Sequence, residues 1–110
     1  MNYINKEVAF RYLTGIEHLF DTLSKSFLDS YKNFENQVSS SYQNDNLEEL
    51  YNHVHSLKGI TLNLGMEELY SACVDVLSSI RFERLSQIQI KKLLDVFNNT
   101  YQELKEIVIS

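Results

Sequence analysis

Two of the chain's three histidines stand one residue apart in the heptapeptide HVHSLKG, residues 53–59. A neutral imidazole can bind a metal ion, move a proton or act as a nucleophile. Because each helical residue turns the chain by about 100°, His53 and His55 lie about 100° to either side of Val54 and point away from each other. Two metal ligands on one helix need a spacing of three or four residues, and no Asp or Glu completes such a set here. The spacing therefore disfavours a metal site and separates the two rings.

The surroundings of His55 differ from those of His53. Lys58 and Gly59 stand three and four residues after His55, at the positions that share its helix face. A glycine inside a helix costs about 1 kcal/mol relative to alanine, so its presence indicates another requirement at the site. We infer that the requirement is space, because a missing side chain here lets a partner approach the His55 ring. Glu48, Tyr51 and Leu62 fall on the same side of the helix.

An accessible histidine beside a cation suits the temporary attachment of a phosphoryl group to the imidazole. An unprotonated ring nitrogen is a nucleophile near pH 7, and Lys58 can offset part of the negative charge of the product. The chain has no Gly-rich phosphate cradle and no pair of aspartates that clearly builds a magnesium site. We therefore expect no cofactor and no metal bound by this chain, and a partner that supplies the chemistry of transfer.

The elements that must position these residues are all predicted to be helices. The chain has no proline and only three glycines, and its apolar residues recur every three or four positions. The pattern predicts helices over residues 5–13, 16 to about 40, 46–65, 66–80 and 86–108. Capping pairs mark three of the starts, namely Thr14 with Glu17, Asn46 with Glu49, and Ser86 with Gln89. The prediction is a single all-α domain, residues 1–110, built as an antiparallel up-and-down four-helix bundle with a short extra N-terminal helix.

Composition narrows the class of partner. The formal net charge is −5 and no basic cluster occurs, so we expect no binding to nucleic acid. The single cysteine, Cys73, cannot form an internal disulfide, which fits a reducing compartment. The N-terminus lacks the pattern of a signal peptide, and no apolar stretch is long enough to cross a bilayer. We expect a soluble cytoplasmic monomer that does not associate with membranes.

The segment HSLKGITLNLGMEEL, residues 55–69, resembles the histidine-containing phosphotransfer (HPt) family of two-component phosphorelays. That family carries an H-x-L-K-G core, then a short spacer and a second glycine before the next helix. The matching positions are His55, Leu57, Lys58, Gly59, Leu64, Gly65 and Leu69. The preceding NLEELYNHV and the helix layout of the whole chain are also similar to the family. Ile60, Thr61 and Ser78 depart from its usual residues, and these departures bear on the identity of the partner rather than on the phosphoryl site.

The resemblance implies that His55 is the phosphoacceptor, that Lys58 supports the phosphoryl group and that Gly59 gives the partner access. It implies two kinds of partner, a response-regulator receiver domain that carries Mg²⁺ and a sensor or hybrid histidine kinase. The chain would be a phosphoryl carrier without kinase activity of its own rather than an enzyme. The predicted docking residues are Gly59, Tyr51, Leu62, Glu48 and Leu28, the last because antiparallel pairing would bring it near the depth of Gly59.

Two other functions stay open at this point. One is a helical adaptor that docks a receiver domain without taking phosphate, and the other is the phosphorylated domain of a chemotaxis-type histidine kinase. The positions of Met1 and Ser110 favour a stand-alone protein over the second alternative. His18 and His53 are expected to be surface or boundary residues without a partner group at matching spacing. Cys73 is expected to be a small buried hydrophobic residue.

Overall fold

The computed structural model describes residues 2–13 and 17–109, apart from the side chains of residues 17, 18 and 109. The described part is helical, and its elements are α1 (Lys6–Tyr12), α2 (Glu17–Ser30), α3 (Phe34–Gln43), α4 (Leu47–Thr61), a short 3₁₀ helix η1 (Leu62–Leu64), α5 (Glu67–Arg81) and α6 (Gln87–Ile109). The all-α class is therefore confirmed. The predicted cap that Thr14 forms with Glu17 lies outside the described residues.

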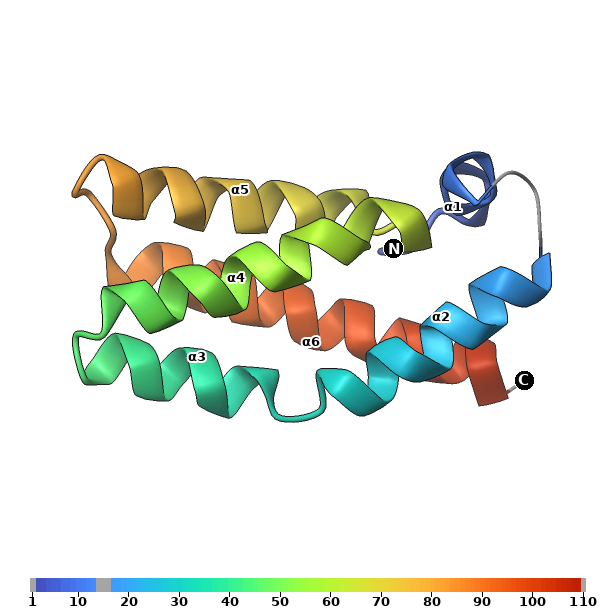
Figure 1. The fold of residues 1–110 in the computed structure, drawn as a ribbon, viewed down its shortest axis with the longest axis horizontal. Coiled ribbons are helices and arrows are strands. Elements are labelled where there is room, and N and C mark those ends of the chain that lie inside the picture. The colour runs from blue at the N-terminus through green and yellow to red at the C-terminus, as the bar shows by residue number, and fades with distance from the viewer. Residues whose placement is uncertain (1, 14–16, 110) are drawn as a thin grey trace.

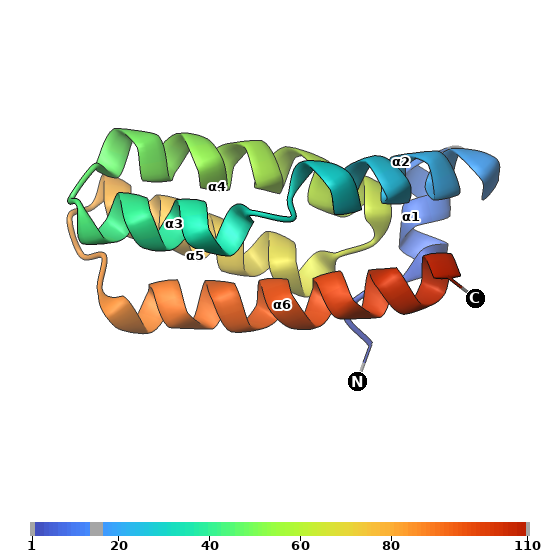
Figure 2. The same ribbon diagram turned by 90° about the horizontal axis from the view of Figure 1, so that it is seen from below.

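The long helices lie side by side along one axis (Figure 1). α4 packs between α3 and α5, α5 also packs on α6, and α6 contacts both α2 and α3. The chain direction reverses from α3 to α4, from α4 to α5 and from α5 to α6 (Figures 1 and 2). α1 lies across one end, where it contacts η1 and α2. The prediction that the short first helix covers one end of the molecule is confirmed.

The prediction of a single helix from residue 16 to about 40 is wrong, because the chain turns over residues 31–33, between α2 and α3. The Tyr31 N–H still donates to the Phe27 carbonyl, but the Phe34 N–H donates to the Tyr31 carbonyl, only three residues back. Ser30 directly precedes this turn and Asn33 is its last residue. Both have short polar side chains, which favour turns over helix interiors. Phe27 and Phe34 are both buried, so the apolar stripe continues across the interruption.

The predicted helix starts at Asn46 and Ser86 are confirmed. The Asn46 side-chain oxygen accepts from the Glu49 N–H at 3.1 Å, and its amide nitrogen donates to the Glu49 carboxylate at 2.9 Å. At the start of α6, the Gln89 side-chain oxygen accepts from the N–H and the hydroxyl of Ser86, both at 2.6 Å. These bonds satisfy polar groups that a helix start leaves without partners, and they set the first residue of α4 and of α6.

Gly65 ends the helical run that begins with α4, as predicted, although the last turn is the 3₁₀ helix η1. The φ of Gly65 is +71°, in the left-handed region. A glycine adopts this conformation at low cost and can therefore end a helix there. An added Cβ would overlap the backbone carbonyl oxygen of Asn5. The Asn5 N–H donates to the Gly65 carbonyl at 2.8 Å, and the Asn5 side chain caps α1. This contact joins the start of α1 to the end of η1.

The rotation of α4 about its own axis is determined by its buried face. Its fully buried residues are Leu50, Val54, Leu57 and Thr61. The Thr61 hydroxyl donates to the Lys58 carbonyl at 2.8 Å, so its buried oxygen has a partner inside the helix. Because this stripe faces the core, the residues about 100° away on either side of it must lie at the flanks of the helix.

Substitution by alanine is expected to have opposite effects at Gly59 and at Gly65. Gly65→Ala places a Cβ against Asn5 in a left-handed backbone, and we expect it to lower the free energy of unfolding by about 2–3 kcal/mol. Gly59→Ala meets open space, and we expect it to raise the free energy of unfolding by up to about 1 kcal/mol. Urea unfolding followed by circular dichroism measures both changes. Equal stability of Gly65→Ala and the unaltered chain would contradict the role assigned to the contact between Asn5 and Gly65.

Candidate functional site

His55 lies in the middle of α4 and is exposed, whereas the preceding Val54 is completely buried. The imidazole stacks on the ring of Tyr51, one helical turn earlier, with the ring centroids 5.8 Å apart and the planes 16° from parallel. Tyr51 is itself partly buried against the core. One side of the imidazole is therefore supported by a ring that the core holds, while the residue stays open to solvent.

Gly59 lies one turn after His55 and is also exposed. A Cβ built at this position would have no neighbour within 4 Å, so no packing requirement of the fold explains a glycine here. A helix-interior glycine without a structural reason costs stability. The open space that the sequence predicted beside His55 is present, and its use by a partner stays a prediction.

Lys58 lies on the α5 side of His55 and is partly buried. Together with Tyr51 it lines a shallow hollow of about 200 Å³ between α4 and α5. The ion pairs found among the described residues do not involve Lys58, so its charge is not neutralised by a carboxylate of the fold. An unpaired ammonium three residues from an exposed imidazole provides a positive field where a phosphoryl group on that ring would carry negative charge.

His53 points away from His55, as the helical rotation predicted, but it does have a partner. Its Nε2 lies 3.3 Å from the Glu49 carboxylate, four residues earlier on the same flank. The expectation that no partner group stands at matching spacing is therefore wrong for His53, and the side chain of His18 lies outside the described residues. His53 therefore takes part in a surface contact between residues four apart on one helix, which is a common type of helical pair.

Cys73, on α5, is buried and forms no disulfide, as predicted. Burial raises the pKa of its thiol to about 12, although the ammonium of Lys58 acts in the opposite direction. The thiol is therefore uncharged near neutral pH, and an uncharged thiol is a poor nucleophile. Cys73 does not compete with His55 as an acceptor of an electrophilic group.

The remaining predicted docking residues are distributed over three elements. Glu48 is exposed in the first turn of α4, and Leu62 is partly buried in η1. Leu28 is partly buried on α2, and its carbonyl oxygen accepts a hydrogen bond from the Tyr101 hydroxyl of α6 at 2.5 Å. The structure therefore associates Leu28 with α6, and its predicted contact with a receiver domain stays a prediction.

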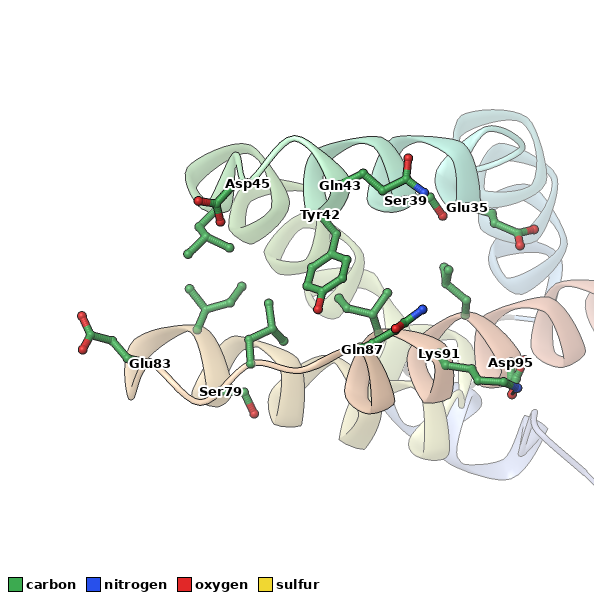
Figure 3. A pocket seen from close by; sticks show the side chains of 15 residues that line it. Glu35, Ser39, Tyr42, Gln43, Asp45, Ser79, Glu83, Gln87, Lys91 and Asp95 are labelled. Atoms are coloured by element: carbon green, nitrogen blue, oxygen red, sulfur yellow. Dashed lines mark hydrogen bonds and ion pairs between the residues drawn. The ribbon is translucent and has the colours of Figure 1, made fainter.

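A larger cavity, of about 840 Å³, lies between α3, the end of α5 and the start of α6 (Figure 3). Asp45 and Glu83 lie at one end of it, and Glu35 and Asp95 lie at the other. Its lysine, Lys91, is paired with Asp95 at 3.0 Å. Its described lining contains no histidine or cysteine. Its described lining offers hydroxyls and carboxylates but no imidazole or thiol, and its one lysine is paired, so the His55 site is the better candidate for accepting a phosphoryl group.

The α5 side of the site was not predicted from the sequence. The hollow beside Lys58 is bordered there by Val74, Leu77, Ser78, Arg81 and Phe82. Phe82 is 65% exposed at the edge of this hollow. The short link through Gly65 indicates that α4 and α5 are neighbours, but which residues of α5 face His55 depends on their packing.

No cluster of three or more His, Cys, Asp or Glu side chains that could hold a metal ion occurs within residues 2–13 and 17–109. None of the helices in that part of the chain has the length and apolarity needed to span a membrane. Comparison of the chain with family models, with curated proteins and with solved structures finds no match. The residues and geometry of the site are therefore what indicates a function for this chain.

Proposed function

We propose that this chain is a histidine phosphotransfer protein that relays a phosphoryl group between the aspartates of receiver domains. The observation that carries the proposal is the environment of His55, an exposed imidazole with an unpaired lysine on one side and open space at Gly59. The resemblance of residues 55–69 to the HPt family supports the same function. In this proposal α2 and α3 together act as one long helix of an antiparallel four-helix bundle, with α4, α5 and α6 as the others.

The transfer step is a displacement at phosphorus. An unprotonated ring nitrogen of His55 forms a bond to phosphorus while the bond from phosphorus to the aspartyl carboxylate of the receiver breaks. The carboxylate leaves with the electron pair of that bond, and the reverse step returns the phosphoryl group to a second aspartate. Phosphoryl transfer depends mainly on positioning and on electrostatic stabilisation. The receiver supplies its own Mg²⁺ for this purpose.

Each neighbour of His55 has one task in this step. Tyr51 holds the ring plane through its stack, which reduces the freedom that the imidazole must lose on reaction. The Lys58 ammonium stabilises the negative oxygens of the phosphoryl group. The space over Gly59 lets the loops of the receiver bring the aspartyl phosphate to the ring without a clash. None of these groups activates a nucleotide, so a separate kinase must introduce the phosphoryl group into the relay.

The partners in this proposal are a receiver domain and a sensor or hybrid histidine kinase, and the chain acts as a cytoplasmic monomer. An adaptor that binds a receiver without accepting phosphate is the alternative from a different functional class. The two differ in one observable, because only the carrier becomes covalently labelled. Labelling of the chain by a phosphorylated receiver therefore distinguishes a carrier from an adaptor.

We expect His55→Gln to abolish labelling when the chain is incubated with a receiver domain carrying radioactive aspartyl phosphate. The unaltered chain should acquire a phosphate that acid removes and base does not, because a phosphoramidate has that stability. His53→Gln is the matched control, since it changes the neighbouring ring on the opposite flank and should retain labelling. Labelling of His55→Gln at the rate of the unaltered chain would refute the proposal. Binding of the receiver with no label on the unaltered chain would favour the adaptor.

We expect Lys58→Ala to slow transfer from the receiver by about tenfold, because a charge-assisted contact of about 1.5 kcal/mol is lost from the reacting phosphoryl group. Lys92→Ala, which removes an exposed lysine of α6, should leave the rate unchanged. Rapid-quench measurement of single-turnover transfer gives the rates, and circular dichroism checks that both variants keep their helices. Equal rates for Lys58→Ala and Lys92→Ala would remove the role assigned to Lys58.

A further inference from the structure

The flank of α5 beside the His55 site forms a continuous surface with α4. The hollow between the two helices is lined by Tyr51, Lys58, Val74, Leu77, Ser78, Arg81 and Phe82. We call the part of this surface that α5 and the residues just after it contribute the α5 strip, and define it as Val74, Ser78, Arg81, Phe82 and Arg84. All of these but the partly buried Ser78 are exposed. Tyr51 connects the strip to the reacting group, because it lines the hollow and also stacks on His55.

The strip exposes apolar area that the fold does not use. Phe82 is 65% exposed and Val74 is 39% exposed, and both border the same hollow. Single exposed apolar side chains are ordinary, whereas two beside one concavity indicate a contact surface. Aromatic side chains at such surfaces often contribute a large share of the binding energy. The hollow therefore offers a place for an apolar group of a partner.

The strip is also positively charged on a chain whose formal net charge is −5. Lys58 and Arg81 line the hollow, and no carboxylate is among the described residues that line it. Glu83, the nearest acidic residue in sequence to Phe82, lines the larger cavity between α3 and α6 instead. The local field therefore favours an acidic partner surface and disfavours a second copy of this acidic chain.

Arg84 gives the strip a defined geometry. Its guanidinium lies 5.5 Å from the centroid of the Phe82 ring, and one of its nitrogens lies 3.4 Å from the Ser78 hydroxyl. A cation held over an aromatic face loses less side-chain freedom on binding than a free arginine would. The apolar and the cationic parts of the strip are thus held together before any partner arrives.

We propose that the α5 strip selects the receiver that exchanges phosphate with His55, by binding a partner surface that presents an apolar side chain surrounded by carboxylates. The inference rests on the proposed function, because it assigns a second contact to the same partner. A receiver that places its aspartyl phosphate at His55 must come close to Tyr51 and Lys58, and these residues border the strip. The strip then contributes to recognition and association, while His55 carries the chemistry.

The test compares two double charge reversals that change the net charge equally. Arg81→Glu with Arg84→Glu alters the strip, and Lys92→Glu with Lys105→Glu alters exposed lysines of α6. The probe is the receiver domain of the source organism that labels the unaltered chain fastest. We expect the strip variant to reduce kcat/KM for transfer by at least about tenfold at low salt, with kcat at saturating receiver little changed. The α6 variant should change kcat/KM by less than about threefold.

Two further measurements separate charge from apolar contact and recognition from chemistry. The defect of the strip variant should shrink as NaCl rises from about 50 to about 500 mM, whereas the defect of Phe82→Ala should persist. Phosphoramidate, a small phosphoryl donor that needs no docking surface, should label His55 equally in every variant.

Equal kcat/KM for the strip variant and the α6 variant would overturn the inference and leave the proposed function intact. Failure of every receiver to label the unaltered chain would reject the proposed function itself and the inference with it.

Discussion

Burial of one apolar stripe determines the orientation of α4, and the candidate site depends on that orientation. Leu50, Val54 and Leu57 have no exposed surface, and exposing one such side chain would cost about 1.5–3 kcal/mol. A rotation of α4 that hid His55 would expose the whole stripe, so the imidazole is held outward by the hydrophobic core. The contact between Gly65 and Asn5 adds a second constraint, because it joins the end of η1, which directly follows α4, to the start of α1.

The site combines this rigid support with two residues that are locally unfavourable for stability. Gly59 lowers the helix propensity of α4 at a position where the fold has room for a side chain. Lys58 keeps an unpaired charge although the chain has more acidic than basic residues. Both features reduce the stability that the chain could have, and both lie beside the same exposed ring. Such concentration of locally unfavourable choices is typical of functional sites in otherwise consistent folds.

Helical periodicity predicted the all-α class, most of the helices and the outward orientation of His55, because each of these follows from the rotation of residues along a helix. The turn at residues 31–33 was missed, since Phe27, Tyr31 and Phe34 keep helical spacing across it and no proline or glycine marks it. The four-residue spacing of Glu49 and His53 indicates their contact, but the contact was not predicted. The α5 strip could not be predicted, because it depends on which face of α5 packs beside α4.

In the proposed function, a ring nitrogen of His55 takes a phosphoryl group from a receiver aspartate. Mass spectrometry of the unaltered chain after incubation with a phosphorylated receiver, kept at alkaline pH to preserve phosphoramidates, tests it most directly. Fragmentation must separate His53 from His55, which lie in one tryptic peptide between Lys32 and Lys58. We expect a single phosphate, on His55. A phosphate on His53, or none on either histidine while the receiver binds, would contradict it.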